Sequence, residues 1–256
     1  MLVVTTASAP MAVALLNPEL TTVLAPSSVL LLPLVLVDLE PNYAQAYSGL
    51  ADCFMSMYDF QFLSPEQSVP QAKAAAEKAL QIDETLAEAH ASLGRLEWLY
   101  DRDQGSAEKE SLRAIELNPN YPTAREWHAR YLADLGRFDE AIAEMKRAQE
   151  LDPLSLIIGS NLGAIYYYSR QYDQAIKELQ RTLEMEPNFE LAHWFLGNTY
   201  ERKRMYQEAV GEYQKALILQ RDQELAAIIG DRLKSEGYAV AIRSLLEAYK
   251  QRAAPY

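Results

Sequence analysis

The residue types that most often carry chemistry are few and scattered in this chain of 256 residues. It has three histidines, His90, His128 and His193, and one cysteine, Cys53. A zinc site needs several such ligands at short spacings, and a disulfide needs a second thiol. Cys53 lies in a helical pattern, where a small buried side chain is the expected role. We therefore predict no metal site and no internal disulfide, and we expect His90 and His193 to be packing residues.

The sequence also lacks the short motifs that mark common enzymes. It has no Gly-x-x-x-x-Gly-Lys or Gly-x-Gly-x-x-Gly phosphate loop, no His-Glu-x-x-His and no Gly-x-Ser-x-Gly. Its many carboxylates fall on predicted solvated helix faces, where Glu144 with Arg147 and Glu178 with Arg181 would form weak pairs. We predict a protein that is not an enzyme, with no catalytic residues, no cofactor and no small-molecule substrate.

The formal net charge of −12 limits the class of partner. A nucleic-acid backbone requires basic surface, and an RNA-reading helical repeat would need a basic groove. An acidic chain instead favours basic or neutral partners. We therefore predict a protein or peptide partner and no nucleic acid.

One pattern recurs every 34 residues. Leu-Asn-Pro-Asn-Tyr at 117–121 is followed by Leu-Asp-Pro-Leu-Ser at 151–155 and Met-Glu-Pro-Asn-Phe at 185–189. Other positions keep the same step: Ala141, Ala175 and Ala209; Phe138, Tyr172 and Tyr206; Leu162-Gly163 and Leu196-Gly197. A period of 34 residues is typical of a stacked helix–turn–helix unit.

Each unit contains two amphipathic helices. In 190–220, one helical face would carry Ala192, Leu196 and Tyr200, and the following helix would present Ala209 and Tyr213. Small residues in both halves let antiparallel helices approach closely. The repeated prolines end one unit and begin the turn to the next, because proline lacks the N–H that a continuing helix needs.

This pattern resembles the tetratricopeptide repeat. The matching residues are His193-x-x-Leu196-Gly197-x-x-Tyr200 with Ala209-x-x-x-Tyr213-x-x-Ala216, and Gly159-x-x-Leu162-Gly163-x-x-Tyr166 with Ala175, Leu179 and Pro187. Arg221 stands where the first of these units would have its closing proline. The resemblance implies an all-α fold, a right-handed superhelical solenoid of about six antiparallel helix pairs.

The predicted array covers 38–256, with repeats at 43–83, 87–118, 122–152, 156–186, 190–220 and 224–252. Nine extra residues fall around 58–70, where an aromatic loop would cap the array or touch a partner. One more residue is inserted near 101–105. Residues 1–37 form a leader without lysine or arginine, which we interpret as disordered or as a misassigned start, with a signal or anchor as the alternative.

The resemblance implies that the first helices of successive repeats line a concave groove for a peptide or partner domain. Transferred by position, the groove residues are Arg95, Trp98, Arg130, Tyr167, Tyr168, Trp194, Asn198 and Arg202. Arginine and aromatic side chains are the types that anchor interfaces. One helix face cannot bury all of 166–168, so Tyr167 and Tyr168 would project into the groove or pack on the neighbouring repeat.

Two further features narrow the predicted role. Asp52 and Glu126 stand where carboxylate-gripping repeats carry polar or basic residues, so a C-terminal chaperone tail is not expected to bind.

The stretch 49–53, the insertion before Ala72 and the stretch 87–94 are similar to C-terminal arrays of bacterial multidomain signalling proteins. We therefore expect a cytoplasmic scaffold in a bacterial signalling or regulatory protein, with no membrane partner. The alternative is a secreted or membrane-tethered assembly factor that uses residues 1–33 as a signal or anchor.

Overall fold

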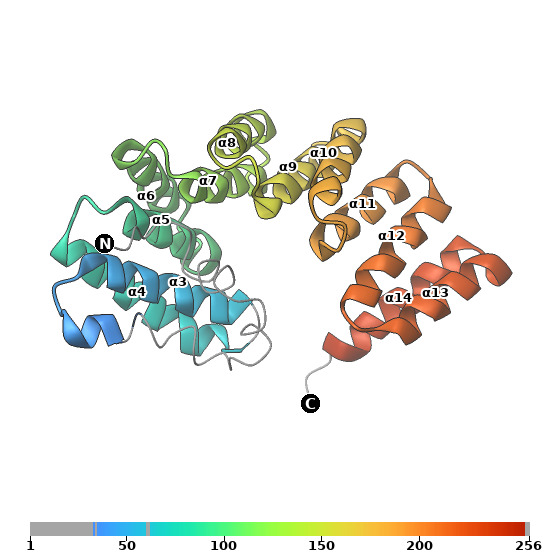
Figure 1. Cartoon of the computed structure of the whole chain (residues 1–256), viewed down its shortest axis with the longest axis horizontal. Coiled ribbons are helices and arrows are strands. Elements are labelled where there is room, and N and C mark those ends of the chain that lie inside the picture. The colour runs from blue at the N-terminus through green and yellow to red at the C-terminus, as the bar shows by residue number, and fades with distance from the viewer. Residues whose placement is uncertain (1–32, 34, 60–61, 254–256) are drawn as a thin grey trace. The chain divides into compact units, whose positions relative to one another are not determined.

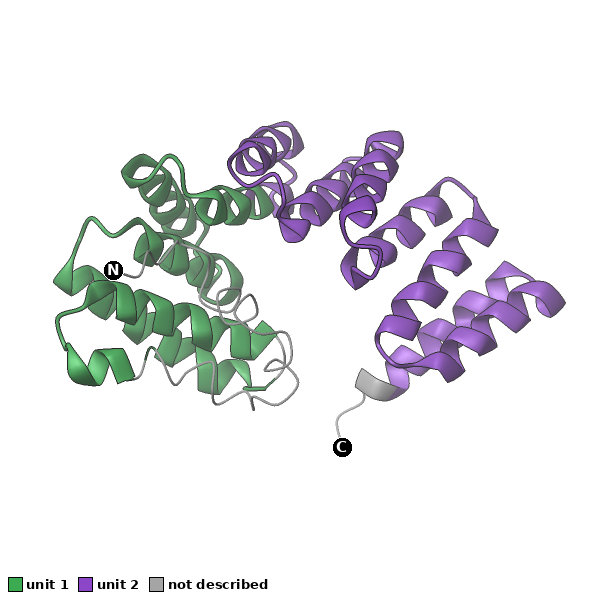
Figure 2. Cartoon of the chain, in the orientation of Figure 1, with its two compact units in different colours: residues 1–131 green, residues 132–256 purple. Residues whose placement is uncertain are grey.

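The computed structural model describes residue 33 and residues 35–59 and 62–253, and every element of regular structure bounded within these ranges is a helix. The leader predicted over 1–37 lies almost wholly outside the described residues. The chain forms two compact units, residues 1–131 and 132–256 (Figures 1 and 2). The predicted all-α class and the packed antiparallel helix pairs are confirmed.

Unit 1 contains two complete helix pairs. Its helices are α3 (Ala44–Asp59), α4 (Pro65–Ile82), α5 (Ala87–Leu96), the π-helical turn η1 (Glu97–Asp101), α6 (Gln104–Leu117) and most of α7 (Pro122–Asp134). Helix α3 packs on α4 and α5 packs on α6. The core between them contains alanines without exposed surface, such as Ala51 and Ala76, beside larger residues such as Phe54 and Leu96.

Unit 2 continues the same arrangement. Its helices are α8 (Phe138–Leu151), α9 (Leu156–Tyr168), α10 (Tyr172–Met185), α11 (Glu190–Arg202), α12 (Tyr206–Leu219), α13 (Gln223–Glu236) and α14 (Tyr238–Ala253). Three first helices, α9, α11 and α13, pack on the second helices α10, α12 and α14. None of the helices in the described part of the chain combines the length and hydropathy that a membrane crossing requires.

The small residues of the repeat lie where the two helices of a pair touch. The alanines Ala141, Ala175 and Ala209 have no exposed surface. A Cβ added at Gly163 would lie 2.5 Å from Cγ of Leu179, so a larger residue would push α9 away from α10. Close approach of the helices therefore explains the period-34 glycine and alanine positions.

The predicted aromatic loop at 58–70 is largely helical. Helix α3 extends to Asp59, and α4 begins at Pro65, preceded by Ser64 as N-cap. The N–H of Ser64 donates to the Gln67 side chain at 3.2 Å, which stabilises the first turn. The loop prediction was too long because Pro65 lies at a first-turn position that helices favour and α4 accommodates Pro70 within its length.

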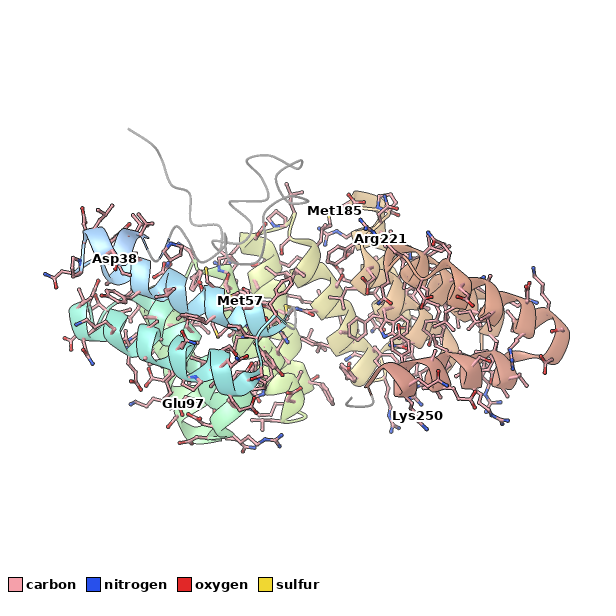
Figure 3. The ribbon with its side chains drawn as sticks, turned by 90° about the horizontal axis from the view of Figure 1, so that it is seen from below. Asp38, Met57, Glu97, Met185, Arg221 and Lys250 are labelled. Carbon is pink, nitrogen blue, oxygen red and sulfur yellow. The ribbon has the colours of Figure 1, made fainter. Side chains whose placement is uncertain are left out.

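The inserted residue of the second repeat forms a π-helical turn. It was predicted near 101–105, whereas the structure places the wider turn at Glu97–Asp101 (Glu97 is labelled in Figure 3). A π-turn adds one residue to a helix without breaking it. The extra residue therefore extends the first helix, and Trp98 and Tyr100 lie on this extension.

A left-handed residue ends the first helix of four successive repeats, again at a spacing of 34. These residues are Arg102 (φ 54°), Gly136 (φ 76°), Arg170 (φ 63°) and Arg204 (φ 61°). Arg221 (φ 64°, labelled in Figure 3) and Gly237 (φ 88°) also have a positive φ near the ends of other helices, Gly237 with an extended ψ of 174°. Only glycine adopts this region without strain, so the arginines are strained here.

Replacing Arg170 by glycine is expected to raise the free energy of unfolding by about 0.5–1 kcal/mol, because the left-handed backbone then carries no Cβ. The measurement is the chemical-denaturation midpoint followed by circular dichroism. Gly136→Ala is the reciprocal control, since nothing lies within 4 Å of an added Cβ there and only backbone strain can lower its stability. Equal effects of the same sign at both positions would contradict this account.

Candidate interaction surfaces

Four of the predicted groove residues of unit 2 come together around two first helices. Tyr167 and Tyr168 lie at the end of α9, with ring centroids 5.2 Å apart. Arg202, at the end of α11, donates from Nε to the Tyr167 hydroxyl at 3.1 Å, and its guanidinium lies 5.9 Å from the Tyr167 ring. Asn198, one turn earlier, accepts a hydrogen bond from the Tyr213 hydroxyl at 2.9 Å.

Tyr168 is the most exposed of these aromatic residues, at 57%. Its ring meets Phe195 edge to face at 6.3 Å, and Tyr166, two residues earlier, is buried as predicted. Tyr168 therefore packs on the neighbouring repeat, and more than half of its surface stays exposed, so its place in a groove stays a prediction. We define Tyr167, Tyr168, Asn198 and Arg202 as the α9–α11 face.

Trp194 lies apart from this exposed pair. Its ring packs against Tyr213 at 5.2 Å and against Tyr249 at 5.7 Å, joining α11 to α12 and α14. Burial, and then the charge of Glu201, raises the pKa of Tyr213, whose hydroxyl also donates to that carboxylate at 3.0 Å. Trp194 is half-buried, so its main visible role is to hold these helices together.

In unit 1, the predicted groove residues are largely engaged with one another. Arg95 is only 8% exposed, its NH2 group lies 2.7 Å from Asp59, and its guanidinium is 5.0 Å from the Trp127 ring. Arg130 lies 5.6 Å from the Trp98 ring and 3.5 Å from a Glu126 oxygen. Two arginine–tryptophan contacts therefore join successive first helices.

Sequence reasoning missed a cluster beside these contacts. The Asp52 carboxylate accepts a hydrogen bond from the Ser92 hydroxyl at 2.7 Å, and Ser92 also lies 3.0 Å from the Glu88 carbonyl oxygen. Burial raises the pKa of Asp52 to about 6. The Ser92 hydrogen bond and the Arg95 charge act to lower this pKa, and the charge of Glu88 raises it further. Tyr121 is buried nearby, and after burial the charges of Asp52, Glu88 and Glu126 raise its pKa.

Two of the three histidines, His90 and His193, form structural contacts of one type. In His193, Nδ1 lies 2.5 Å from a Glu212 oxygen and Nε2 lies 2.8 Å from the Pro187 carbonyl oxygen. His90 repeats this with Glu110 at 2.6 Å and the Glu84 carbonyl oxygen at 3.0 Å. Within the described ranges no three acidic, histidine or cysteine side chains are grouped to hold a metal ion.

Glu110 and Glu212 belong to a period-34 series that sequence reasoning placed partly in solvent. The series is Glu110, Glu144, Glu178 and Glu212. Glu178 is 15% exposed at its side chain, and it accepts hydrogen bonds from Gln149 at 2.5 Å and Arg181 at 3.2 Å, so its assignment to a solvated face was wrong. Arg147 pairs with Glu150 at 2.7 Å. The glutamates stabilise helix contacts rather than a catalytic site.

Cys53 is fully buried. Burial, and then the charge of Asp52, raises the pKa of its thiol to about 12, so the nucleophilic thiolate is disfavoured. The thiol is therefore a packing group, in line with its position in the helical pattern.

The comparisons with known proteins agree with the fold. Residues 99–155 and 161–224 match the family model of the Tetratricopeptide repeat. PilF of Pseudomonas aeruginosa has 19% identity and a TM-score of 0.62 over 83% of this chain and 93% of that chain. PilW, a type IV pilus biogenesis factor, has 21% identity and a TM-score of 0.64 over 83% and 94%. Human IFIT1 with m7Gppp-AAAA has 17% identity and a TM-score of 0.70 over 90% and 56%.

The chain contains tetratricopeptide repeats, which the family model places over residues 99–155 and 161–224. Tetratricopeptide repeats are non-catalytic scaffolds, and this part of the chain has that architecture. The comparison with curated proteins finds no match.

Proposed function

We propose that the chain binds a peptide or partner domain on the exposed sides of its first helices, as a scaffold in a signalling or regulatory protein. The observation that carries this proposal is the α9–α11 face, where Tyr168 is more than half exposed beside Tyr167 and Arg202. Aromatic and arginine side chains contribute most to binding energy when a partner covers them. The predicted groove, its eight residues, the repeat boundaries and the cytoplasmic location belong to this proposal.

The prediction that the chain does not bind nucleic acid rests on its net charge alone. Human IFIT1 has the same fold in a structure with m7Gppp-AAAA, so the repeat fold by itself is compatible with such a ligand. The net charge of −12 disfavours phosphate backbones in this chain. The exclusion therefore stays a prediction.

The test is capture of a partner from the source cell by residues 38–256, compared with the variant Tyr168→Ala/Arg202→Ala. We expect the double variant to lose at least 10-fold in affinity, equivalent to about 1.4 kcal/mol. It removes the exposed ring of Tyr168 and the guanidinium that lies beside the Tyr167 ring. The matched control is Ile218→Ala/Arg147→Ala, which removes exposed side chains from second helices. Unchanged binding by a folded Tyr168/Arg202 variant would show that the α9–α11 face is not the binding surface.

A second candidate is an assembly factor tethered or secreted through residues 1–33. The similarity of the fold to that of PilW, a type IV pilus biogenesis factor, supports this second candidate. Sequencing of the mature amino terminus separates the two candidates, because a secretory signal is removed near the end of its apolar segment. An intact terminus would favour the cytoplasmic scaffold.

A further inference from the structure

Two carboxylates on the first helices of unit 1, those of Asp52 and Glu88, form no ion pair with a cationic side chain in the described part of the chain, although the Arg95 charge acts on Asp52 from beyond salt-bridge distance. Asp59 pairs with Arg95 at 2.7 Å, and Glu126 lies 3.5 Å from Arg130. Asp52 accepts only the Ser92 hydroxyl among the described residues, and the Glu88 carboxylate has neither a hydrogen bond nor an ion pair there. Asp52 and Glu88 lie close enough to repel each other electrostatically.

Two buried polar atoms beside these carboxylates lack a hydrogen-bond partner in the described part of the chain. The Ser48 hydroxyl belongs to a side chain that is 2% exposed, and it lies one turn before Asp52 on the same side of α3. The Arg95 Nε–H belongs to a side chain held by Asp59 and Trp127. Buried polar groups nearly always have partners, so these atoms point to a ligand that supplies them.

The four groups define the chemistry of that ligand. Two carboxylates and a hydroxyl oxygen can accept the hydrogens of an ammonium or guanidinium group, with the charge-assisted bonds that such pairs form. Arg95 Nε–H can donate to a carbonyl oxygen of the same ligand. A hard metal ion such as Ca²⁺ takes about six to eight oxygen ligands, more than two carboxylates and a hydroxyl supply. A cationic side chain on a polypeptide has both required groups.

We propose that unit 1 binds a lysine or arginine side chain of a partner polypeptide between Asp52, Glu88 and Ser48, while Arg95 binds a main-chain carbonyl of the same segment. This inference rests on the proposed scaffold function and adds the chemistry of the partner. Acidic residues outnumber basic ones in unit 1, so long-range attraction also favours a basic segment. The ligand chemistry is the reverse of the carboxylate tails that other members of the class bind.

The test is an NMR titration of the full chain with Nα-acetyl-lysine N-methylamide, which carries the ammonium and two amide carbonyls. We expect a dissociation constant on the order of millimolar, as suits so small a ligand. The indole N–H signals of Trp127 and Trp98 in unit 1 should shift, whereas that of Trp194 in unit 2 should not. The norleucine analogue has the same four-carbon side chain without the ammonium group, and it should bind at least 10-fold more weakly.

The variant Asp52→Asn/Glu88→Gln should weaken lysine binding at least 10-fold. Glu84→Gln/Glu116→Gln removes the same charge from exposed positions of unit 1 and should change affinity less than twofold. Equal binding of norleucine, or wild-type affinity in the Asp52/Glu88 variant, would overturn the inference. Captured partner that is lost in the Tyr168/Arg202 variant, together with no lysine effect, would overturn this inference alone and leave the scaffold function standing.

Discussion

Replacement of Gly197 by alanine is expected to lower the free energy of unfolding by about 2–3 kcal/mol. A Cβ at this position would lie 2.6 Å from Cε1 and 2.7 Å from Cδ1 of Tyr213, and 3.2 Å from the Ala209 carbonyl oxygen. The ring has little room to move, because it packs on Trp194 and its hydroxyl donates to Asn198. The substitution must therefore separate α11 from α12.

The same substitution in the facing helix provides the control. Nothing lies within 4 Å of a Cβ added at Gly211, so Gly211→Ala should raise stability by about 0.5–1 kcal/mol through helix propensity. Chemical denaturation followed by circular dichroism measures both variants, and Trp194 fluorescence reports on the site itself. A Gly197→Ala protein as stable as the wild type would mean that the two helices are not in the close contact described here.

The fold could be predicted because the sequence repeats the same pattern of helix-packing residues several times. Ala175 recurs in register as Ala141 and Ala209, and all three are buried without exposed surface. Single-residue changes to the pattern were harder to place. The extra residue between Leu93 and Ala114 was detected by counting, but only backbone geometry shows that it widens a helical turn at Glu97–Asp101.

The sequence predicted which residues would lie on the first helices, but it did not predict which side chains would contact one another. The repeat register placed Arg202 and Tyr167 on successive first helices, and the structure brings them within hydrogen-bond distance. The register could not show that Arg95 is buried against Asp59, because that pairing depends on the extra residues that lengthen α3. Asp52 was predicted only to repel a carboxylate ligand and Glu88 was given no role, since their lack of a close ion pair appears only once the neighbouring helices are in place.

The second large effect is expected at Asp52, where asparagine should stabilise the protein at neutral pH. Burial raises the pKa of this carboxyl to about 6, so the folded state holds its proton more tightly than the unfolded state does. The stability that comes from the bound proton is present below about pH 4, decreases between about pH 4 and 6, and is lost above that range. At 1.36 kcal/mol per pKa unit, the full effect is about 3 kcal/mol as an upper value.

Asparagine cannot ionise, yet its side-chain oxygen can still accept the Ser92 hydroxyl. We therefore expect Asp52→Asn to gain up to about 3 kcal/mol above pH 6 and to match the wild type near pH 4. Denaturant unfolding at pH 4 and pH 8 measures both. Asp83 is the control, because hydrogen bonds from Thr85 lower its pKa, so Asp83→Asn should show no gain at pH 8. A gain at Asp52 that is the same at both pH values would contradict the account.

Ionised Asp52 lowers the stability of the fold, so an acidic residue at this position is expected to have another role. Binding of a lysine side chain is such a role. Ser92 has one hydroxyl hydrogen for two acceptors, Asp52 Oδ1 and the Glu88 carbonyl oxygen. A protonated Asp52 could donate to Ser92 and free that hydrogen for the Glu88 carbonyl oxygen. An ionised Asp52 is compensated only in part by the more distant Arg95 charge, so a bound cation would stabilise it. Asp52→Asn should thus strengthen the fold while it weakens lysine binding, a trade-off that marks binding residues and that packing residues do not show. Opposite changes in stability and affinity in this one variant would link the buried charge to the partner.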